Sequence, residues 1–575
     1  MSNNHSTVVF YALMAIAVFF SQPAAAQRNE IKMGSEYDRN SLSVLILDRE
    51  NSKLPPDFLA RYEKSIQIGS KFFVNQLGVN FLSGQFKLNA VQTKTSSELQ
   101  QEVKKEEQEK LNVPKDKNAK LLGKALKESF SGMGSGLEKV SYDPDSLSRQ
   151  IEAKLEAQNM GAKIMGIWSQ TDQAGNFAEL VRRVEYNQSG EKTLTSKDKD
   201  KISNFRGLFY RNYIIVLDFN EIITIEEYYR RTGTKIDKDT PKGFACNAAG
   251  YVYRLNVDEK LFEAFIKPNF DNKEILLQHP YDMEFVCKIT KPGKQAEYSK
   301  NYQGQYTGTE SDVYGKLMSS LYSDVLFTLE QRFEPFKAKA RIVSTDPIKA
   351  TIGEREEVEP SQRAYLYAYV KHKPKRVAVV RAFSVGQNMN SQVDGSGNVI
   401  TSTYRQVWGR KVQEGAFLVQ QKDIGLCLGV GYAPGDEQSA ANLRAEINLH
   451  RLFGRASSGS LGALTGLHLY GEMYFESKTA KEGYVSDEFS HYGIGLSKRI
   501  YKSRFINLEP FAGYYFYGDK NNKTTYYRGG LRIPIAIMPN VFLSPEISFA
   551  LDSDSKSGEL FAEDIPVNAT LRFEF

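Results

Sequence analysis

Apolar and polar residues alternate repeatedly along the last part of the chain, residues 422–575. Eight runs of about ten residues follow this pattern. They span residues 424–432, 442–450, 467–476, 491–500, 506–517, 526–535, 541–552 and 565–575. A period of two places successive side chains on opposite faces of an extended strand. The pattern therefore predicts eight β-strands, each with one apolar and one polar face.

The length and spacing of these runs indicate a barrel that crosses a membrane. A tilted strand needs roughly 9–11 residues to cross a bilayer, and such barrels alternate long loops with short turns. Polar connections near 433–441, 478–489, 518–524 and 552–564 tend to alternate with shorter ones. Aromatic residues gather near the run ends, at Tyr432, Phe475, Tyr492, Tyr514, Phe516, Tyr527 and Phe549. The alternative is a water-soluble sandwich or small barrel with its apolar face inside.

The polar faces of the runs carry charges of both signs. They are Arg444, Glu446, Glu472, Glu476, Arg499, Glu509, Arg528, Arg532, Glu546, Arg572 and Glu574. An eight-stranded barrel is just wide enough for side chains to fill, and buried charges are tolerated when they are paired. We expect a plugged interior of paired charges, not a diffusion pore.

Residues 422–575 resemble the eight-stranded barrels of Gram-negative outer membranes. The ending "LRFEF", with Phe573 and the terminal Phe575, is similar to the C-terminal signal read by the barrel-assembly machinery of that membrane. The resemblance implies outer-membrane lipid and that machinery as partners. It also implies that the C-terminal strand ends on the periplasmic side. Because an even strand count returns the chain to its starting side, residues 27–421 are then expected in the periplasm, facing an unknown partner there.

The N-terminus has the features of a secretory signal peptide. Residues 8–20 are an apolar core too short to span a membrane, and three alanines at 24–26 follow. Cleavage after Ala26 is expected, so the signal peptide covers 1–26. In an exported chain, Cys246 and Cys287 are candidates for a disulfide; the alternative is two buried free thiols.

The residues between the signal peptide and the barrel predict two further domains, so the fold class is α+β. Residues 27–335 mix strands, at 41–50, 210–222, 243–257 and 282–290, with a helix at 311–333 and a charged insertion near 98–136. Residues 146–169 are expected to form a helix followed by a strand. Residues 342–420 predict a small all-β, SH3-like module with a Gly- and Asn-rich loop.

Composition and motifs favour no catalytic role. The net charge of +6 is small for 575 residues, which argues against nucleic-acid binding. Metal-ligand spacing and nucleotide or hydrolase motifs are missing, so no metal or cofactor is expected. One candidate remains: His491 follows Ser490 and lies near Asp487 and Glu488, an arrangement that could activate a hydroxyl for a lipid-modifying reaction. The alternative is an ordinary junction between a loop and a strand.

These observations lead to one main hypothesis. The chain is expected to be a non-enzymatic outer-membrane barrel with a periplasmic domain, serving envelope organisation, assembly or anchoring. An outer-membrane lipid-modifying enzyme and a secreted soluble binding protein are the alternatives.

Overall fold

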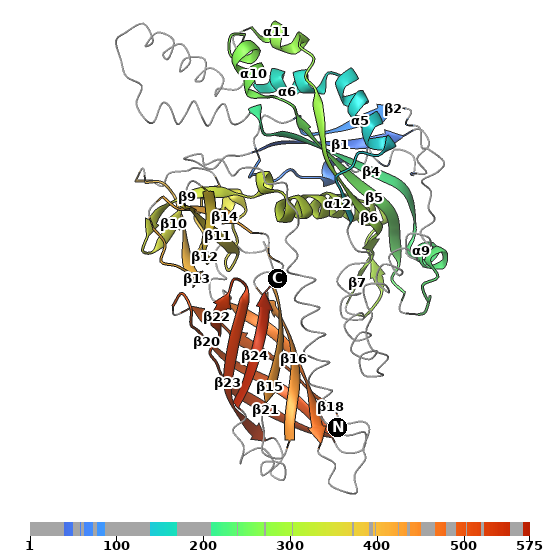
Figure 1. Ribbon diagram of the computed structural model, residues 1–575. Helices are drawn as coiled ribbons and strands as arrows, with labels where there is room; N and C mark the ends of the chain where they lie inside the picture. The colour runs from blue at the N-terminus through green and yellow to red at the C-terminus, as the bar shows by residue number, and fades with distance from the viewer. Residues whose placement is uncertain are drawn as a thin grey trace. The chain divides into compact units, whose positions relative to one another are not determined.

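The computed structural model is shown in Figure 1. It describes residues 40–49, 63–72, 77–84, 139–168, 209–301 (except 239, 270 and 271), 303–370, 373–389, 398–421 (except 414), 425–433, 438–449, 466–478, 490–518 (except 502), 523–552 and 567–574, with the single residues 54, 58, 86, 395, 396 and 423. The expected signal peptide at 1–26, the expected charged insertion near 98–136 and Phe575 lie outside these residues. Two compact units divide the described chain, one within 38–329 and one within 330–575. No helix in the described parts is long and apolar enough to cross a membrane.

The first unit is built on a six-stranded mixed sheet in the order β2-β1-β4-β5-β6-β3. The strands are β1 (Ser41–Arg49), β2 (Val79–Gly84), β3 (Lys139–Ser141), β4 (Asn212–Thr224), β5 (Gly243–Leu255) and β6 (Met283–Glu297). β1 pairs in parallel with β2 and β4, whereas the other pairs are antiparallel. β1 and most of β4 are buried on both faces, which explains their nearly continuous apolar sequences.

Helices cover both faces of this sheet. α5 (Ser146–Ala157) and α6 (Met160–Trp168) share one hydrophobic core with Leu45, Val216 and Tyr251. α12 (Glu310–Arg332) packs on the opposite face, where Gly250 lets Val325 approach the strand closely. The remaining elements are η1 (Glu63–Ser65), α9 (Ile225–Thr232), α10 (Glu259–Leu261), η3 (Phe262–Ile266), α11 (Lys273–Gln278) and a short hairpin of β7 (Ser299–Lys300) and β8 (Tyr306–Thr307).

Two expectations for this unit are wrong. Residues 160–168 form a helix, α6, where a strand was expected. Gly161 and Gly166 lie in this helix, where Tyr281 and Leu277 pack too closely against them to leave room for a side chain. Cys246 and Cys287 do not form a disulfide: both are buried free thiols. They lie on adjacent strands at different register positions, since Cys246 is opposite Lys294 and Cys287 is opposite Val252.

The second unit begins with a closed six-stranded antiparallel barrel. Its strands are β9 (Lys339–Thr345), β10 (Ile348–Ala350), β11 (Arg363–Val370), β12 (Lys373–Ser384), β13 (Ser402–Gly409) and β14 (Phe417–Gln420). They run around the barrel in the order β10-β13-β12-β11-β14-β9, with short 3-10 turns η4 (Glu334–Phe336) and η5 (Glu354–Glu356) beside them. Apolar side chains such as Leu366, Val380 and Leu418 fill the core. The expected all-β module is therefore present as a barrel.

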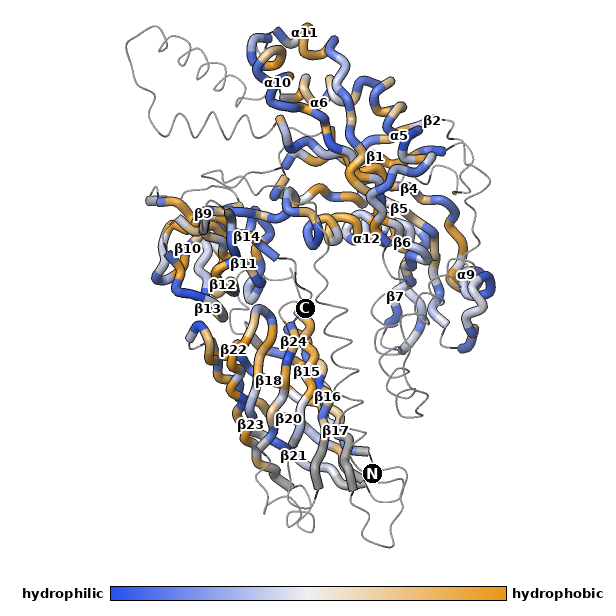
Figure 2. Tube along the Cα trace, in the orientation of Figure 1, coloured by the Kyte–Doolittle hydropathy of each residue, from blue (hydrophilic) through white to orange (hydrophobic). Residues whose placement is uncertain are grey.

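An eight-stranded antiparallel barrel completes the unit. Its strands are β15 (Leu426–Ala433), β16 (Gln438–Asn448), β17 (Leu467–Lys478), β18 (Ser490–Lys498), β20 (Asn507–Gly518), β21 (Lys523–Arg532), β23 (Val541–Asp552) and β24 (Val567–Glu574). The ring closes because β24 pairs with both β23 and β15, and β18 pairs with β20. Two short strands, β19 (Ile500–Tyr501) and β22 (Ile535–Met538), extend one rim. All eight expected strands are confirmed, and alternating hydrophobic and hydrophilic residues follow them in Figure 2.

Candidate functional site: the filled interior of the eight-stranded barrel

The wall of the eight-stranded barrel is apolar outside and polar inside. Along β23 the exposed fractions alternate: Glu546 is 0% exposed, Ile547 57%, Ser548 2% and Phe549 60%. The same alternation on other strands exposes Tyr432, Met473, Tyr492, Ile494, Leu496, Tyr527, Leu531, Leu543 and Leu571. The apolar face of the strands therefore points outward, whereas the alternative of a soluble sandwich or small barrel expected it inside.

Glu546 is the centre of one half of the charged interior. It accepts hydrogen bonds from Arg444 at 2.8 Å, from Arg528 at 2.9 Å and from Arg532 at 2.7 Å. Glu472 is a second acceptor in this layer, bonded to Arg444 and, at 2.8 Å, to the hydroxyl of Tyr515. All three guanidinium groups are nearly or fully buried. The layer is stable only as a set, because each buried charge depends on its partners.

Glu509 is the centre of the other half. Arg499 donates to it at 3.1 Å, Arg532 at 3.5 Å and Arg572 at 2.9 Å. Arg572 also pairs with Glu446, and Arg499 pairs with Glu574. Arg532 thus links the two halves, since it binds both Glu546 and Glu509. Five arginines and five glutamates form one continuous network across the barrel.

The other expected residues of this region have different outcomes. Glu476 lies on β17 opposite Ala440, but its side chain is outside the described part of the chain. Phe573 is half-buried on β24, opposite Leu428 and Val541.

Aromatic residues fill the end of the interior nearest the long loops. Tyr470, Tyr474, Phe511, Tyr515 and Tyr526 form one buried cluster. His491 is stacked on Tyr474, with 4.4 Å between ring centroids, and its Nε2 lies 2.6 Å from the Tyr526 hydroxyl. Glycines make room for these rings: a side chain at Gly493 would collide with Tyr515. The sequence analysis did not predict this aromatic cluster. The tyrosines do occupy positions on the polar faces of their strands, and that pattern could have indicated that they point inward.

His491 does not face lipid. It is 8% exposed and its ring points into the aromatic cluster. Asp487 and Glu488 lie outside the described residues, and the side chain of Ser490 does too. The grouping of His491 with Ser490, Asp487 and Glu488 therefore stays a prediction, and the described position of His491 is inside the wall.

The six-stranded barrel contacts the opposite end of the charged interior. Arg381 on β12 pairs with Glu574, lies 3.2 Å from the Asp423 carboxylate and donates to the Ser361 carbonyl at 2.6 Å. Arg363 on β11 donates to the backbone carbonyl of Glu574 at 3.2 Å. The two contacts with Glu574 could not be read from the sequence, because they join residues 193 and 211 positions apart.

Two further bonds fix the same arrangement at the rim. Arg405 on β13 donates to the Tyr501 carbonyl at 3.0 Å. Asn540, in the turn after β22, donates to the Tyr365 hydroxyl at 3.1 Å. Three adjacent strands of the six-stranded barrel, β11, β12 and β13, therefore contact the mouth of the larger barrel.

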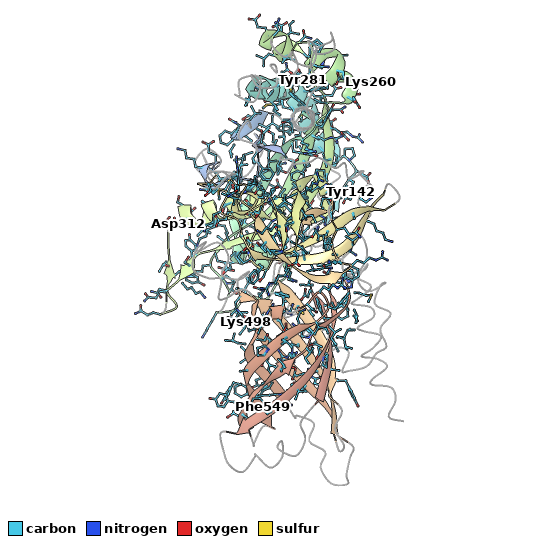
Figure 3. The ribbon with its side chains drawn as sticks, turned by 90° about the vertical axis from the view of Figure 1, so that its left-hand side faces the viewer. Tyr142, Lys260, Tyr281, Asp312, Lys498 and Phe549 are labelled. Carbon is cyan, nitrogen blue, oxygen red and sulfur yellow. The ribbon has the colours of Figure 1, made fainter. Side chains whose placement is uncertain are left out.

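The first unit offers weaker candidate sites. A surface hollow of about 610 Å³ is lined by Ser65, Ser299, Thr307, Asp312 and Lys316, among others, and Figure 3 labels Asp312. Its polar groups bond to each other: Asp312 accepts from Thr309 N at 2.8 Å, and Lys316 donates to Ser299 at 2.9 Å. Within the described residues no group of three His, Cys, Asp or Glu side chains is arranged to hold a metal ion.

One ion pair is buried in the sheet of this unit. Arg49 donates to Asp218 at 2.5 Å, and both side chains are less than a tenth exposed. Burial raises the pKa of Asp218 even though Arg49 opposes that shift. The pair joins β1 to β4 across the buried middle of the sheet, which fits a structural role.

Comparison with known proteins identifies no family. No family model matches the chain, and no curated protein matches it. Among solved structures, a chain from work titled "De novo design of transmembrane beta-barrels" is 14% identical, covers 27% of this chain and 98% of its own, and has a TM-score of 0.18. The attachment invasion locus protein Ail of Yersinia pestis is 10% identical, covers 26% of this chain and 90% of its own, and has a TM-score of 0.14. These likenesses are too weak to carry an argument about function.

Proposed function

We propose that the eight-stranded barrel anchors the chain in a Gram-negative outer membrane. One observation carries the proposal: the wall exposes apolar side chains all around while its charges are inside. A water-soluble protein rarely exposes so large an apolar surface, whereas a membrane barrel needs an outward apolar band and a closed ring of strands. Tyr492, Tyr514, Phe516 and Tyr527 contact one another on the outside of β18, β20 and β21, as an interfacial aromatic girdle would.

The anchor does not conduct. The Arg–Glu network fills the interior, and the six-stranded barrel lies across one mouth through Arg363 and Arg381. An ion would have to displace several buried ion pairs to pass, and each unpaired charge in such a site is costly. The chain is thus proposed to be a non-enzymatic anchor. The side chain of His491, the candidate for lipid chemistry, lies inside the barrel, where it stacks on Tyr474 and bonds with Tyr526.

The soluble regions are proposed to lie in the periplasm. β15 begins and β24 ends at the same rim, since Cys427 is paired with Glu574, so the chain that precedes β15 enters the barrel on the side where the chain ends. The Phe573–Phe575 ending is proposed to be read by the barrel-assembly machinery. The first unit then serves envelope organisation or assembly by holding a periplasmic partner near the membrane.

Three measurements test this function. The membrane-extracted chain should migrate faster on gels before heating than after, as folded barrels do. Protease added to intact cells should cut only near 433–441, 478–489, 518–524 and 552–564. The purified chain should show no large single-channel conductance in planar bilayers. A chain that is recovered entirely in the soluble fraction contradicts the anchor, and cuts within 27–421 on intact cells contradict the orientation.

A further inference from the structure

The rim between the two barrels carries an apolar surface of its own. We call it the apolar collar and define it as Phe383, Ile500, Phe505, Ile506, Ile537 and Met538, each 39–55% exposed. Five of these residues belong to the short strands β19 and β22 and to the turn after β19. That turn is joined to β22, because Phe505 O accepts from Ala536 N at 2.8 Å and Ile506 forms a bridge with Ile535.

The sixth residue of the collar, Phe383, comes from the six-stranded barrel. The guanidinium of Arg405 lies 3.8 Å from the centre of the Phe383 ring and also donates to the Tyr501 carbonyl on β19. This one side chain therefore places Phe383 beside the rim of the larger barrel. The collar is formed by both barrels and depends on their being docked.

The collar continues the outer wall. Along β18 and β19 the outward positions are Leu496, Lys498 and Ile500, of which the two apolar residues are 47% and 39% exposed. Figure 3 labels Lys498 near the end of the wall closest to the six-stranded barrel and Phe549 near the other end. An apolar surface that begins on the wall thus extends past Lys498 onto the rim.

Two arginine side chains contact aromatic rings of the collar. Arg405 is stacked on Phe383, and the exposed Arg504 lies 5.1 Å from the Phe505 ring centre. Amphipathic aromatic and cationic side chains are typical of the level where acyl chains meet headgroups, with the apolar part in the membrane and the charge at the phosphates. A hydrated periplasmic surface would give these six apolar side chains no such partner.

We propose that the apolar collar is buried in the phospholipid headgroup layer of the leaflet next to the six-stranded barrel, with Arg405 and Arg504 at the phosphate groups. The six-stranded barrel is then a membrane-contacting module as well as a cap. This inference rests on the proposed membrane anchor. The inference adds that β12 and β13 of the six-stranded barrel contact the same leaflet.

The test places one fluorescent thiol label at a time on the full chain reconstituted in phosphatidylcholine–phosphatidylglycerol vesicles. The variants are Phe383→Cys and Met538→Cys for the collar, Ile494→Cys for the wall, and Val343→Cys as the matched control. Val343 is 57% exposed on β9, which is opposite β12 in the six-stranded ring. Unmodified chain, whose three cysteines are buried, gives the background. Quenching is measured with lipids brominated near the headgroup and with aqueous iodide.

The collar labels are expected to lose most of their fluorescence to the brominated lipid and little to iodide, whereas the Val343→Cys label shows the reverse. Lipid quenching at Ile494→Cys with iodide quenching at Phe383→Cys and Met538→Cys would overturn the collar and leave the anchor intact. Iodide quenching at all four positions would overturn the anchor as well.

Adding Arg504→Gln, which removes an exposed charge from the collar, should reduce the lipid quenching of Met538→Cys when phosphatidylglycerol is present. No reduction would refute the assignment of Arg504 to the phosphates.

Discussion

Two closed antiparallel barrels follow one another along this chain, and their side chains are arranged in opposite ways. In the six-stranded barrel, Leu366 and Val380 are 0% exposed and form an apolar core. In the eight-stranded barrel, Arg532 and Glu546 are 0% exposed, and the apolar side chains are outside. Both use the same period of two along their strands. The difference teaches that strand periodicity defines two faces, while the surroundings of the barrel decide which face is inside.

The largest expected effect tests the charged interior. Glu546→Ala leaves Arg444, Arg528 and Arg532 without their shared carboxylate. The free energy of unfolding should therefore fall by about 3–5 kcal/mol. Folded and unfolded barrel are separated by gel mobility across a urea series in lipid vesicles. The neighbouring Ile547→Leu keeps an apolar side chain on the outer face and should change the free energy of unfolding by no more than about 0.5 kcal/mol. Equal changes in the free energy of unfolding for the two variants would mean that the interior network does not stabilise the barrel.

The next prediction compares the outer faces of the two barrels. Ile547→Arg puts a charge on the outer wall that is proposed to face lipid, at an expected cost of about 2–4 kcal/mol near the bilayer midplane. Val343→Arg puts the same charge on the outer face of the six-stranded barrel, where water accepts it, and should cost no more than about 0.5 kcal/mol. Urea unfolding of both variants in vesicles measures the contrast. A harmless arginine at Ile547 would contradict a lipid-facing wall.

A smaller effect is expected where the two barrels meet. Arg381 and Glu574 form a buried pair that joins β12 to β24. Arg381→Gln, Glu574→Gln and the double variant form a cycle whose coupling free energy should be about 0.5–3 kcal/mol. Thermal loss of gel mobility and urea titration give the four stabilities. Strict additivity would show that the Arg381–Glu574 pair contributes no coupling free energy across the two barrels.

The smallest effect is expected in the first unit, at the partly exposed ion pair between Asp145 and Lys288. It serves as a comparison for the buried ion pairs of the larger barrel. Asp145 caps α5 through Ser148 N at 2.7 Å and accepts from Lys288 at 2.7 Å. Burial acts to raise the pKa of Asp145, but these hydrogen bonds outweigh it, and the pKa lies below its usual 3.8. Asp145→Ala should cost about 0.5–2 kcal/mol at neutral pH, far less than Glu546→Ala.

The pH dependence of that variant follows from the sign of the shift. A lowered pKa in the folded state gives stability that is present above the unfolded value of 3.8 and is lost as the pH falls through the folded value. The difference between wild type and Asp145→Ala should therefore shrink below pH 3.8. Circular dichroism during urea unfolding measures it, and the exposed Asp143→Ala serves as the control. A difference that grows on acidification would contradict the assignment.

Much of the larger barrel could be predicted from sequence, because strand faces are a local property. The eight runs ended within a few residues of the observed strands, and the arginines and glutamates assigned to the polar face lie inside wherever their side chains are described. The helix at 160–168 was missed because Gly161 and Gly166 disfavour a helix locally, and only the packing of Tyr281 and Leu277 explains them. The disulfide candidate failed because pairing requires a register that spacing in the sequence does not give.

The number of strands in the larger barrel, the two faces of each strand and the balance of charge on the polar face can all be read from the sequence. They can be read there because they depend on a side-chain period of two within each short segment. Three features become visible only in the folded chain: Arg532 bridges Glu509 and Glu546, His491 stacks inside on Tyr474, and Arg381 of the six-stranded barrel pairs with Glu574. Those contacts arise when strands far apart in the chain close into a ring with one register, which then fixes which charges meet.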